Sequence, residues 1–148
     1  MIIGVPKEIY LGERRVALVP RGAEALRKLG FEIIVESSAG ESADYSNAKY
    51  EEVGVKLAKD AKEVWASSDI ILKVREPLNN EADMMKDGGT LISFFWPAKN
   101  GELLERLNAK NVTVLAMDCI PRITRAQKMD ALSSMGNIAG YRAVIEAA

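Results

Sequence analysis

Short β-branched runs alternate with helix-forming segments along this chain, and this alternation constrains its fold more than any other feature. The expected strands are IIGV, FEIIVE, DIILKV, TLISFF and NVTVLAM, at 2–5, 31–36, 69–74, 90–95 and 111–117. The expected helices lie between them, at 21–30, 46–68, 79–89 and 99–110, and several of them close with glycine. The pattern predicts an α/β fold with a mostly parallel sheet flanked by helices.

Polar residues and prolines follow four of the five expected strands. The stretches are PKE, REP, WPAKN and DCIPRITR, at 6–8, 75–77, 96–100 and 118–125. Each of them alone is ordinary loop sequence. Because ligands of parallel sheets bind at the carboxyl ends of the strands, the four stretches together favour a site at this edge.

Several cations near these strand ends could orient an anionic or polar ligand: Lys7, Arg15, Lys73, Arg75, Arg122 and Arg125. Lys73 lies inside the apolar run IILKV, so it requires a carboxylate partner, a path to water or a functional role. Glu8 and Glu76 are the candidate partners. Trp96 is expected to pack as a core residue, although an aromatic ring there could also form one wall of a cleft.

The stretch PRITRAQKMDALSS, at 121–134, is the most polar of these segments. Thr124 is a candidate N-cap for a helix that begins near Arg125. At helical spacing, one polar stripe would contain Gln127, Asp130, Ser134, Asn137 and Tyr141. The other faces are apolar and small, so we expect this helix to be packed on several sides.

Two side chains of this stripe suggest a polar clamp. Gln127 can both donate and accept hydrogen bonds, and Asp130 could hold Arg122 in position. Such a clamp orients a ligand without acid–base catalysis, which suits hydride transfer between cofactors.

The residues that the chain lacks exclude several classes of site. It contains no histidine, so the usual base of a Ser/His or Cys/His nucleophile and the commonest transition-metal ligand are missing. No metal site is expected, because no Asp/Glu cluster has a recognisable loop spacing. Cys119, the single cysteine, is expected to be a packed thiol.

Net charge, hydropathy and the lack of a phosphate-binding motif limit the partners and ligands that the sequence predicts. A formal net charge of −1 gives no argument for nucleic acid. No apolar run approaches the roughly 18 residues of a membrane span, so a soluble, intracellular chain is expected. No glycine-rich phosphate-binding fingerprint follows a strand, so spacing alone places no dinucleotide on this chain.

Longer stretches carry a family resemblance. IGVPKE, ERRVALVP and ILKVREP resemble elements shared by alanine dehydrogenases and the NAD(H)-binding component of proton-translocating NAD(P) transhydrogenases. ISFFWPAKN and NVTVLAMDCIPRITRAQKMDALSSMGNIAGYRA resemble the transhydrogenase pattern. The resemblance implies a Rossmann-like, flavodoxin-like domain over 1–120, then a nicotinamide-proximal loop and the start of a long interdomain helix over 121–148. It also implies that a second, NAD-binding domain lies outside this chain.

The resemblance implies roles for four residues. Arg122 would contact the carboxamide region of nicotinamide, Asp130 and Ser133 would orient the ring, and Gln127 would reach toward the partner nucleotide. The implied reaction is direct hydride transfer from NADH to NADP⁺, with NADP(H) bound by a different component and a membrane component translocating protons. A homodimer at the cytoplasmic face of a prokaryotic inner membrane is implied as well.

Two other functions remain open. An alanine dehydrogenase would use a histidine near the end of the fourth strand, together with cations matching Arg15 and Lys73. The corresponding stretch here reads FFWPA and has no histidine, whereas both cations are present. The chain by itself, without a cofactor domain, is expected to be inactive and to behave as a non-catalytic assembly domain.

Overall fold

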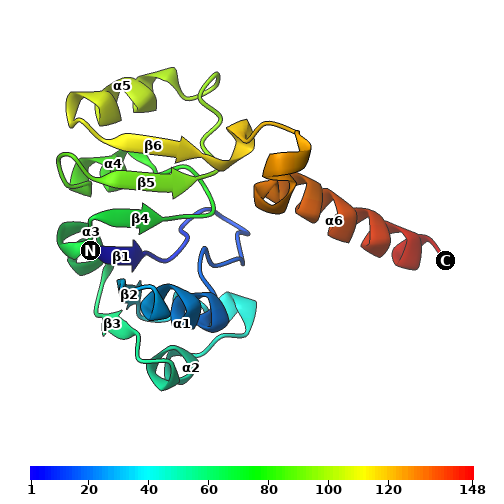
Figure 1. Cartoon of the computed structure of the whole chain (residues 1–148), viewed down its shortest axis with the longest axis horizontal. Helices are drawn as coiled ribbons and strands as arrows, with labels where there is room; N and C mark the ends of the chain where they lie inside the picture. Colours follow the sequence, from blue (N-terminus) through cyan, green and yellow to red (C-terminus); the bar gives the residue numbers. More distant parts are fainter.

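The computed structural model describes residues 1–148, and its centre is a six-stranded parallel sheet (Figure 1). The strand order is β3-β2-β1-β4-β5-β6. The strands are β1 (Ile2–Val5), β2 (Glu32–Glu36), β3 (Lys56–Ala58), β4 (Ile70–Leu72), β5 (Thr90–Ser93) and β6 (Thr113–Ala116). The α/β architecture and all five expected strands are confirmed.

The sixth strand, β3, corrects the prediction of one helix over 46–68. That region forms α2 (Asn47–Glu52), then β3, then α3 (Ala61–Ser67). Gly54 has a φ of 73°, a left-handed conformation that ends the first helix and that glycine adopts without strain. β3 then pairs with β2 at the edge of the sheet.

Helices cover the two faces of the sheet and form two separate apolar cores. On one face, side chains from α3, α4 (Asn79–Met84) and α5 (Gly101–Ala109) pack with Ile71, Leu91 and Phe95. On the other face, α1 (Pro20–Lys28) and α2 pack against inward residues of β1 and β2, including Val5 and Val35. The carboxyl ends of the parallel strands therefore share one edge, and the loops that follow them meet there.

The last helix, α6 (Ala131–Ala147), projects away from the sheet beyond the end of β6 (Figure 1). None of its residues is buried, and Ile138, Tyr141 and Val144 are each at least 70% exposed. The expected packing on several sides is therefore wrong for this chain. No helix of the structure combines the length and apolarity that crossing a membrane requires.

The start of α6 also differs from the prediction. Residues 124–129 form a 3-10 helix, η3 (Thr124–Met129), and Thr124 caps nothing. The N-cap is Asp130, whose carboxylate accepts the amide of Ser133. Because Gln127 lies in η3 and α6 begins only at Ala131, the expected polar stripe from Gln127 to Tyr141 is not one helix face.

Candidate functional site

One cavity brings together the four residues to which the resemblance assigns roles. It has a volume of about 280 Å³ and is lined by Arg122, Ile123, Thr124, Gln127, Asp130 and Ser133. Between β6 and this cavity lies a short 3-10 helix, η2 (Met117–Cys119). The cavity therefore lies beyond the carboxyl end of an edge strand, where the sequence predicted a site.

Asp130 is the fixed acidic group of the cavity. Its carboxylate accepts hydrogen bonds from the Ser133 hydroxyl at 2.5 Å and from the Ser133 amide at 3.0 Å. Only 7% of the Asp130 surface is exposed. These hydrogen bonds from Ser133 lower the pKa of Asp130, and the charge of Arg122 acts in the same direction. Asp130 thus carries a negative charge at neutral pH.

Arg122 and Gln127 make no hydrogen bond with another side chain, and both residues are exposed. The expected Asp130–Arg122 ion pair is absent, because Asp130 is engaged by Ser133 instead. A ligand in the cavity could therefore bind the five N–H donors of the Arg122 guanidinium. It could also bind the donor and acceptor groups of the Gln127 amide. The buried Ala126 anchors the intervening η3 turn.

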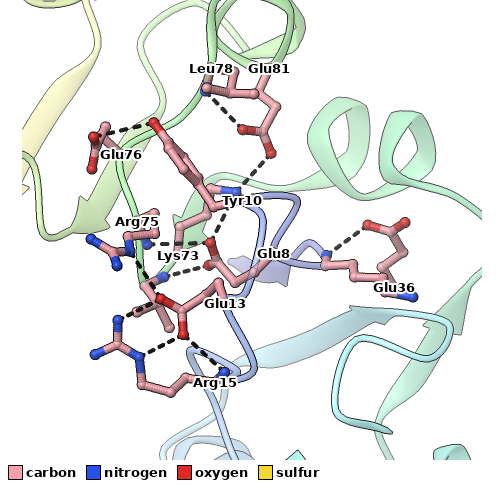
Figure 2. A network of polar contacts seen from close by, with 12 residues as sticks. Glu8, Tyr10, Glu13, Arg15, Glu36, Lys73, Arg75, Glu76, Leu78 and Glu81 are labelled. Atoms are coloured by element: carbon pink, nitrogen blue, oxygen red, sulfur yellow. Dashed lines mark hydrogen bonds and ion pairs between the residues drawn. The ribbon is translucent and has the colours of Figure 1, made fainter. Parts of the chain in front are cut away.

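A second polar cluster occupies the carboxyl ends of β1 and β4 (Figure 2). The fully buried Lys73 ammonium lies 2.8 Å from a Glu81 oxygen and 3.5 Å from a Glu8 oxygen. Burial raises the pKa of Glu8, while the charge of Lys73 and the amides of Val74 and Arg75 oppose that rise. Of the candidate partners of Lys73, Glu8 is thus confirmed.

Glu76 is not a partner of Lys73. It accepts a hydrogen bond from the Tyr10 hydroxyl at 3.2 Å. The closer partner, Glu81, was missed because it lies in α4, eight residues along the chain, and no local spacing indicates the contact.

Arg15 is held by Glu13 in the same cluster (Figure 2). The Glu13 carboxylate accepts hydrogen bonds from Nε of Arg15 at 2.7 Å and from its Nη2 at 2.6 Å. It also accepts a hydrogen bond from Nε of Arg75 at 2.9 Å. The hydrogen bonds from Arg15 are the main reason that the pKa of Glu13 falls to about 2. The charges of Arg15 and Lys73 are therefore already paired within the protein.

The remaining candidates lie outside both clusters or differ from expectation. Lys7 and Arg125 are exposed, and Arg125 is not among the residues lining the cavity. Cys119 is exposed, so the expected packed thiol is wrong. Trp96 is 39% exposed, so it is not a core residue, whereas the neighbouring Phe95 is fully buried.

Comparison with known proteins shows the family of the chain. Residues 4–139 match the family model described as "Alanine dehydrogenase/PNT, N-terminal domain". The chain is 54% identical to NAD(P) transhydrogenase subunit alpha of Cereibacter sphaeroides over 147 residues, which are 99% of this chain and 28% of that protein. It is 36% identical to alanine dehydrogenase of Bacillus subtilis, over 97% of this chain and 38% of that enzyme.

Among solved structures, the crystal structure of transhydrogenase from Sinorhizobium meliloti superimposes with a TM-score of 0.94 at 37% identity. The match covers 99% of this chain and 43% of that one. This chain thus spans less than half the length of the proteins that it resembles. It belongs to the alanine dehydrogenase/PNT N-terminal domain family.

Proposed function

We propose that this chain forms the NAD(H)-side portion of an NAD(P) transhydrogenase, in which a hydride passes directly between NADH and NADP⁺. NADP(H) would be held by another component, and membrane partners would couple the exchange to proton translocation. The relatives are named as subunits, which supports a multi-component assembly. Homodimerisation and a position at the cytoplasmic side of the membrane belong to the same proposal.

The observation that carries this proposal is the cavity of Arg122, Gln127, Asp130 and Ser133. A nicotinamide carboxamide offers one carbonyl acceptor and one amino donor. The unpaired guanidinium of Arg122 matches the carbonyl, and the ionised carboxylate of Asp130 matches the amino group. Ser133 fixes the orientation of that carboxylate, and Gln127 keeps both donor and acceptor groups for a neighbouring nucleotide.

The size of the cavity limits what this cavity can hold. A volume of about 280 Å³ falls just below the usual range for small-molecule sites, so it fits one end of a dinucleotide and not the whole. The absence of a glycine-rich fingerprint agrees with that limit. The rest of the dinucleotide would be bound by a part of the enzyme outside this chain.

The chain supplies positioning rather than proton transfer. NADH itself carries the hydride, so the protein must align two nucleotides and exclude competing reactions. Arg122, Gln127 and Asp130 are fixed-charge or amide groups, which orient a ligand without changing protonation near neutral pH. A histidine-free chain therefore suits this reaction.

The alanine dehydrogenase function is less well supported. Its substrate cations would match Arg15 and Lys73, but Glu13 holds one and Glu8 and Glu81 hold the other. An amino-acid carboxylate would have to displace these internal carboxylates. The structure also offers no histidine for the proton transfer that amino-acid oxidation requires.

The proposal can be tested in a hybrid enzyme. This chain would replace the matching segment of the Cereibacter sphaeroides alpha subunit, and the hybrid would be mixed with its partner components. The assay follows NADH-dependent reduction of an oxidised NADP analogue, with L-alanine-dependent reduction of NAD⁺ as the second reaction. We expect transfer between nucleotides and no alanine oxidation.

The matched variants are Gln127→Asn and Glu105→Asp, because each shortens an exposed side chain by one methylene. Gln127→Asn should slow transfer by at least about tenfold, since small displacements of positioning groups are costly. Glu105 lies on α5 and is not among the residues that line the cavity, so Glu105→Asp should leave the rate unchanged. Equal rates in both variants would contradict a role for the cavity, and alanine oxidation without transfer would favour the dehydrogenase.

The isolated chain provides a further check. We expect it to transfer no hydride, because the cavity holds only one end of a dinucleotide. Binding of NADH by the isolated chain at micromolar affinity would count against this expectation.

A further inference from the structure

Asp118 links the loops that follow two neighbouring strands. It lies in η2, directly after β6, and its carboxylate accepts the amide of Phe95 at 2.6 Å. The amide of Trp96 lies 3.1 Å and 3.2 Å from the two carboxylate oxygens. Phe95 and Trp96 follow the end of β5, which pairs with β6 up to Ser93 and Ala116.

The backbone at Trp96 is what these bonds hold in place. Its φ of 51° lies in the left-handed region, which a bulky residue adopts only when its surroundings impose it. Partial burial raises the pKa of Asp118, but the amides of Phe95 and Trp96 more than offset that effect, and the pKa is lowered overall. Asp118 therefore stays ionised at neutral pH and forms charge-assisted bonds to both amides.

Asp118 is also the last residue before the cavity that is hydrogen-bonded to the sheet edge. From Cys119 to Asp130, the hydrogen bonds reach only Asp118 on one side and the start of α6, at Ser133 and Ser134, on the other. The next hydrogen bond to the rest of the protein is made by Met135 in α6, whose sulfur accepts it from Arg15. Asp118 is thus the nearest such contact before Arg122, which lies four residues further along the chain.

We propose that Asp118 is a positioning residue, which fixes the cavity of Arg122, Gln127 and Asp130 relative to the carboxyl ends of β5 and β6. It is not among the residues that line the cavity, and it acts through the segment that follows it. Without its charge, the Trp96 backbone relaxes and the 119–130 segment loses its nearest polar contact with the loop after β5. The link to hydride transfer rests on the proposed function, whereas the anchor itself does not.

The anchor can be measured in the chain itself through tryptophan fluorescence. The chain has two tryptophans: Trp65 is buried, and Trp96 is 39% exposed. Acrylamide quenching therefore reports mainly on Trp96, and a Trp96→Phe variant gives the contribution of Trp65 alone. Asp118→Asn should raise the quenching of Trp96 about twofold, while Asp118→Glu, which keeps the charge, should restore much of the native value.

The consequence for function is measured in the hybrid enzyme. Asp118→Asn should lower kcat for nucleotide-to-nucleotide transfer by about tenfold to a hundredfold, with a much smaller change in KM for NADH. Asp118→Glu should recover part of kcat. The matched control is Asp87→Asn, which makes the same change in an exposed turn before β5 and should alter neither readout.

Each result separates the anchor from the proposed function. Unchanged quenching in Asp118→Asn overturns the anchor, and raised quenching with an unchanged kcat overturns the positioning role. If the hybrid carries out no transfer even with the native chain, the proposed function fails while quenching still tests the anchor. If Asp118→Asn does not fold, Asp118→Glu decides. Near-native quenching with kcat within about tenfold of the native value supports the need for a carboxylate, whereas near-native quenching with a larger loss of kcat refutes the mechanism.

Discussion

Removing the buried ammonium of Lys73 should destabilise the chain strongly. Lys73 lies within 3.5 Å of carboxylate oxygens of both Glu8 and Glu81, and all three side chains are at most 3% exposed. Replacing Lys73 by methionine keeps much of the volume but leaves two carboxylates without a counter-charge. Breaking a buried pair in this way costs about 3–5 kcal/mol, which is a large share of the stability of a domain.

The loss should be visible in both thermal and chemical unfolding. For a chain of this length, 1 kcal/mol shifts Tm by about 2–4 °C, so Lys73→Met should lower Tm by about 6–20 °C. Urea unfolding followed by circular dichroism gives the free energy directly. The control is Lys28→Met, which removes an ion pair of almost the same length, 2.7 Å to Glu24, on an exposed helix face. It should change stability very little, because water and salt screen exposed pairs.

The dependence on pH tests the electrostatic cause. The pKa of Glu8 is already raised in the folded chain, and it should rise further when the lowering charge of Lys73 is removed. The folded variant then binds a proton more tightly than the unfolded one, so its stability falls as pH rises above about 4.5. The deficit of Lys73→Met relative to the native chain should therefore be smaller at pH 5 than at pH 8.

Two results would refute this reasoning. The first is a loss below about 1 kcal/mol at pH 8, which would mean that the cluster tolerates two unpaired carboxylates. The second is an equal loss at pH 5 and pH 8, which would indicate a packing defect. Adding Glu81→Gln to Lys73→Met should recover part of the loss, because one of the two unpaired charges is then removed.

Two further predictions concern packing and acid stability. Gly4→Ala should lower the free energy of unfolding in urea by about 1–3 kcal/mol, since the new Cβ would lie 2.1 Å from Ser68 Oγ. The control is Gly101→Ala, whose Cβ would meet nothing within 4 Å, and it should leave the free energy of unfolding unchanged. The pKa of Glu13 falls to about 2, so the stability that it contributes is present above about pH 4.5 and is lost as pH falls toward 2. Glu13→Gln should therefore be less stable than the native chain at pH 7, and urea unfolding should show the two converging toward pH 2.

The sequence was sufficient for most of the fold, because long β-branched runs and helical periodicity are strong local signals. β3 escaped this reasoning because it has only three residues and no β-branched side chain. Its pairing with β2 is a tertiary contact, which overrides the helical propensity of the surrounding stretch. Gly54, and Asp60 as the N-cap of α3, were the local signs that the predicted helix is interrupted.

The candidate site was predictable in its residues but not in its geometry. The resemblance indicated Arg122, Gln127, Asp130 and Ser133, and the cavity contains all four. The helix start was wrong because Thr124 and Asp130 are both good N-cap residues, and periodicity does not choose between them. The structure shows that Asp130 caps α6 and binds Ser133, which leaves Arg122 unpaired.

The two polar clusters at the sheet edge differ in whether their charges are already paired. Buried polar groups that are fully partnered stabilise a fold, whereas donors and acceptors left open at a cavity can bind a ligand. Lys73 and Arg15 belong to the first kind, and Arg122 and Gln127 belong to the second. The clusters also touch, because Arg15, held by Glu13, donates to Met135 in α6, two residues beyond Ser133. The paired cluster thus supports, through Arg15, the helix that carries Ser133 of the open one.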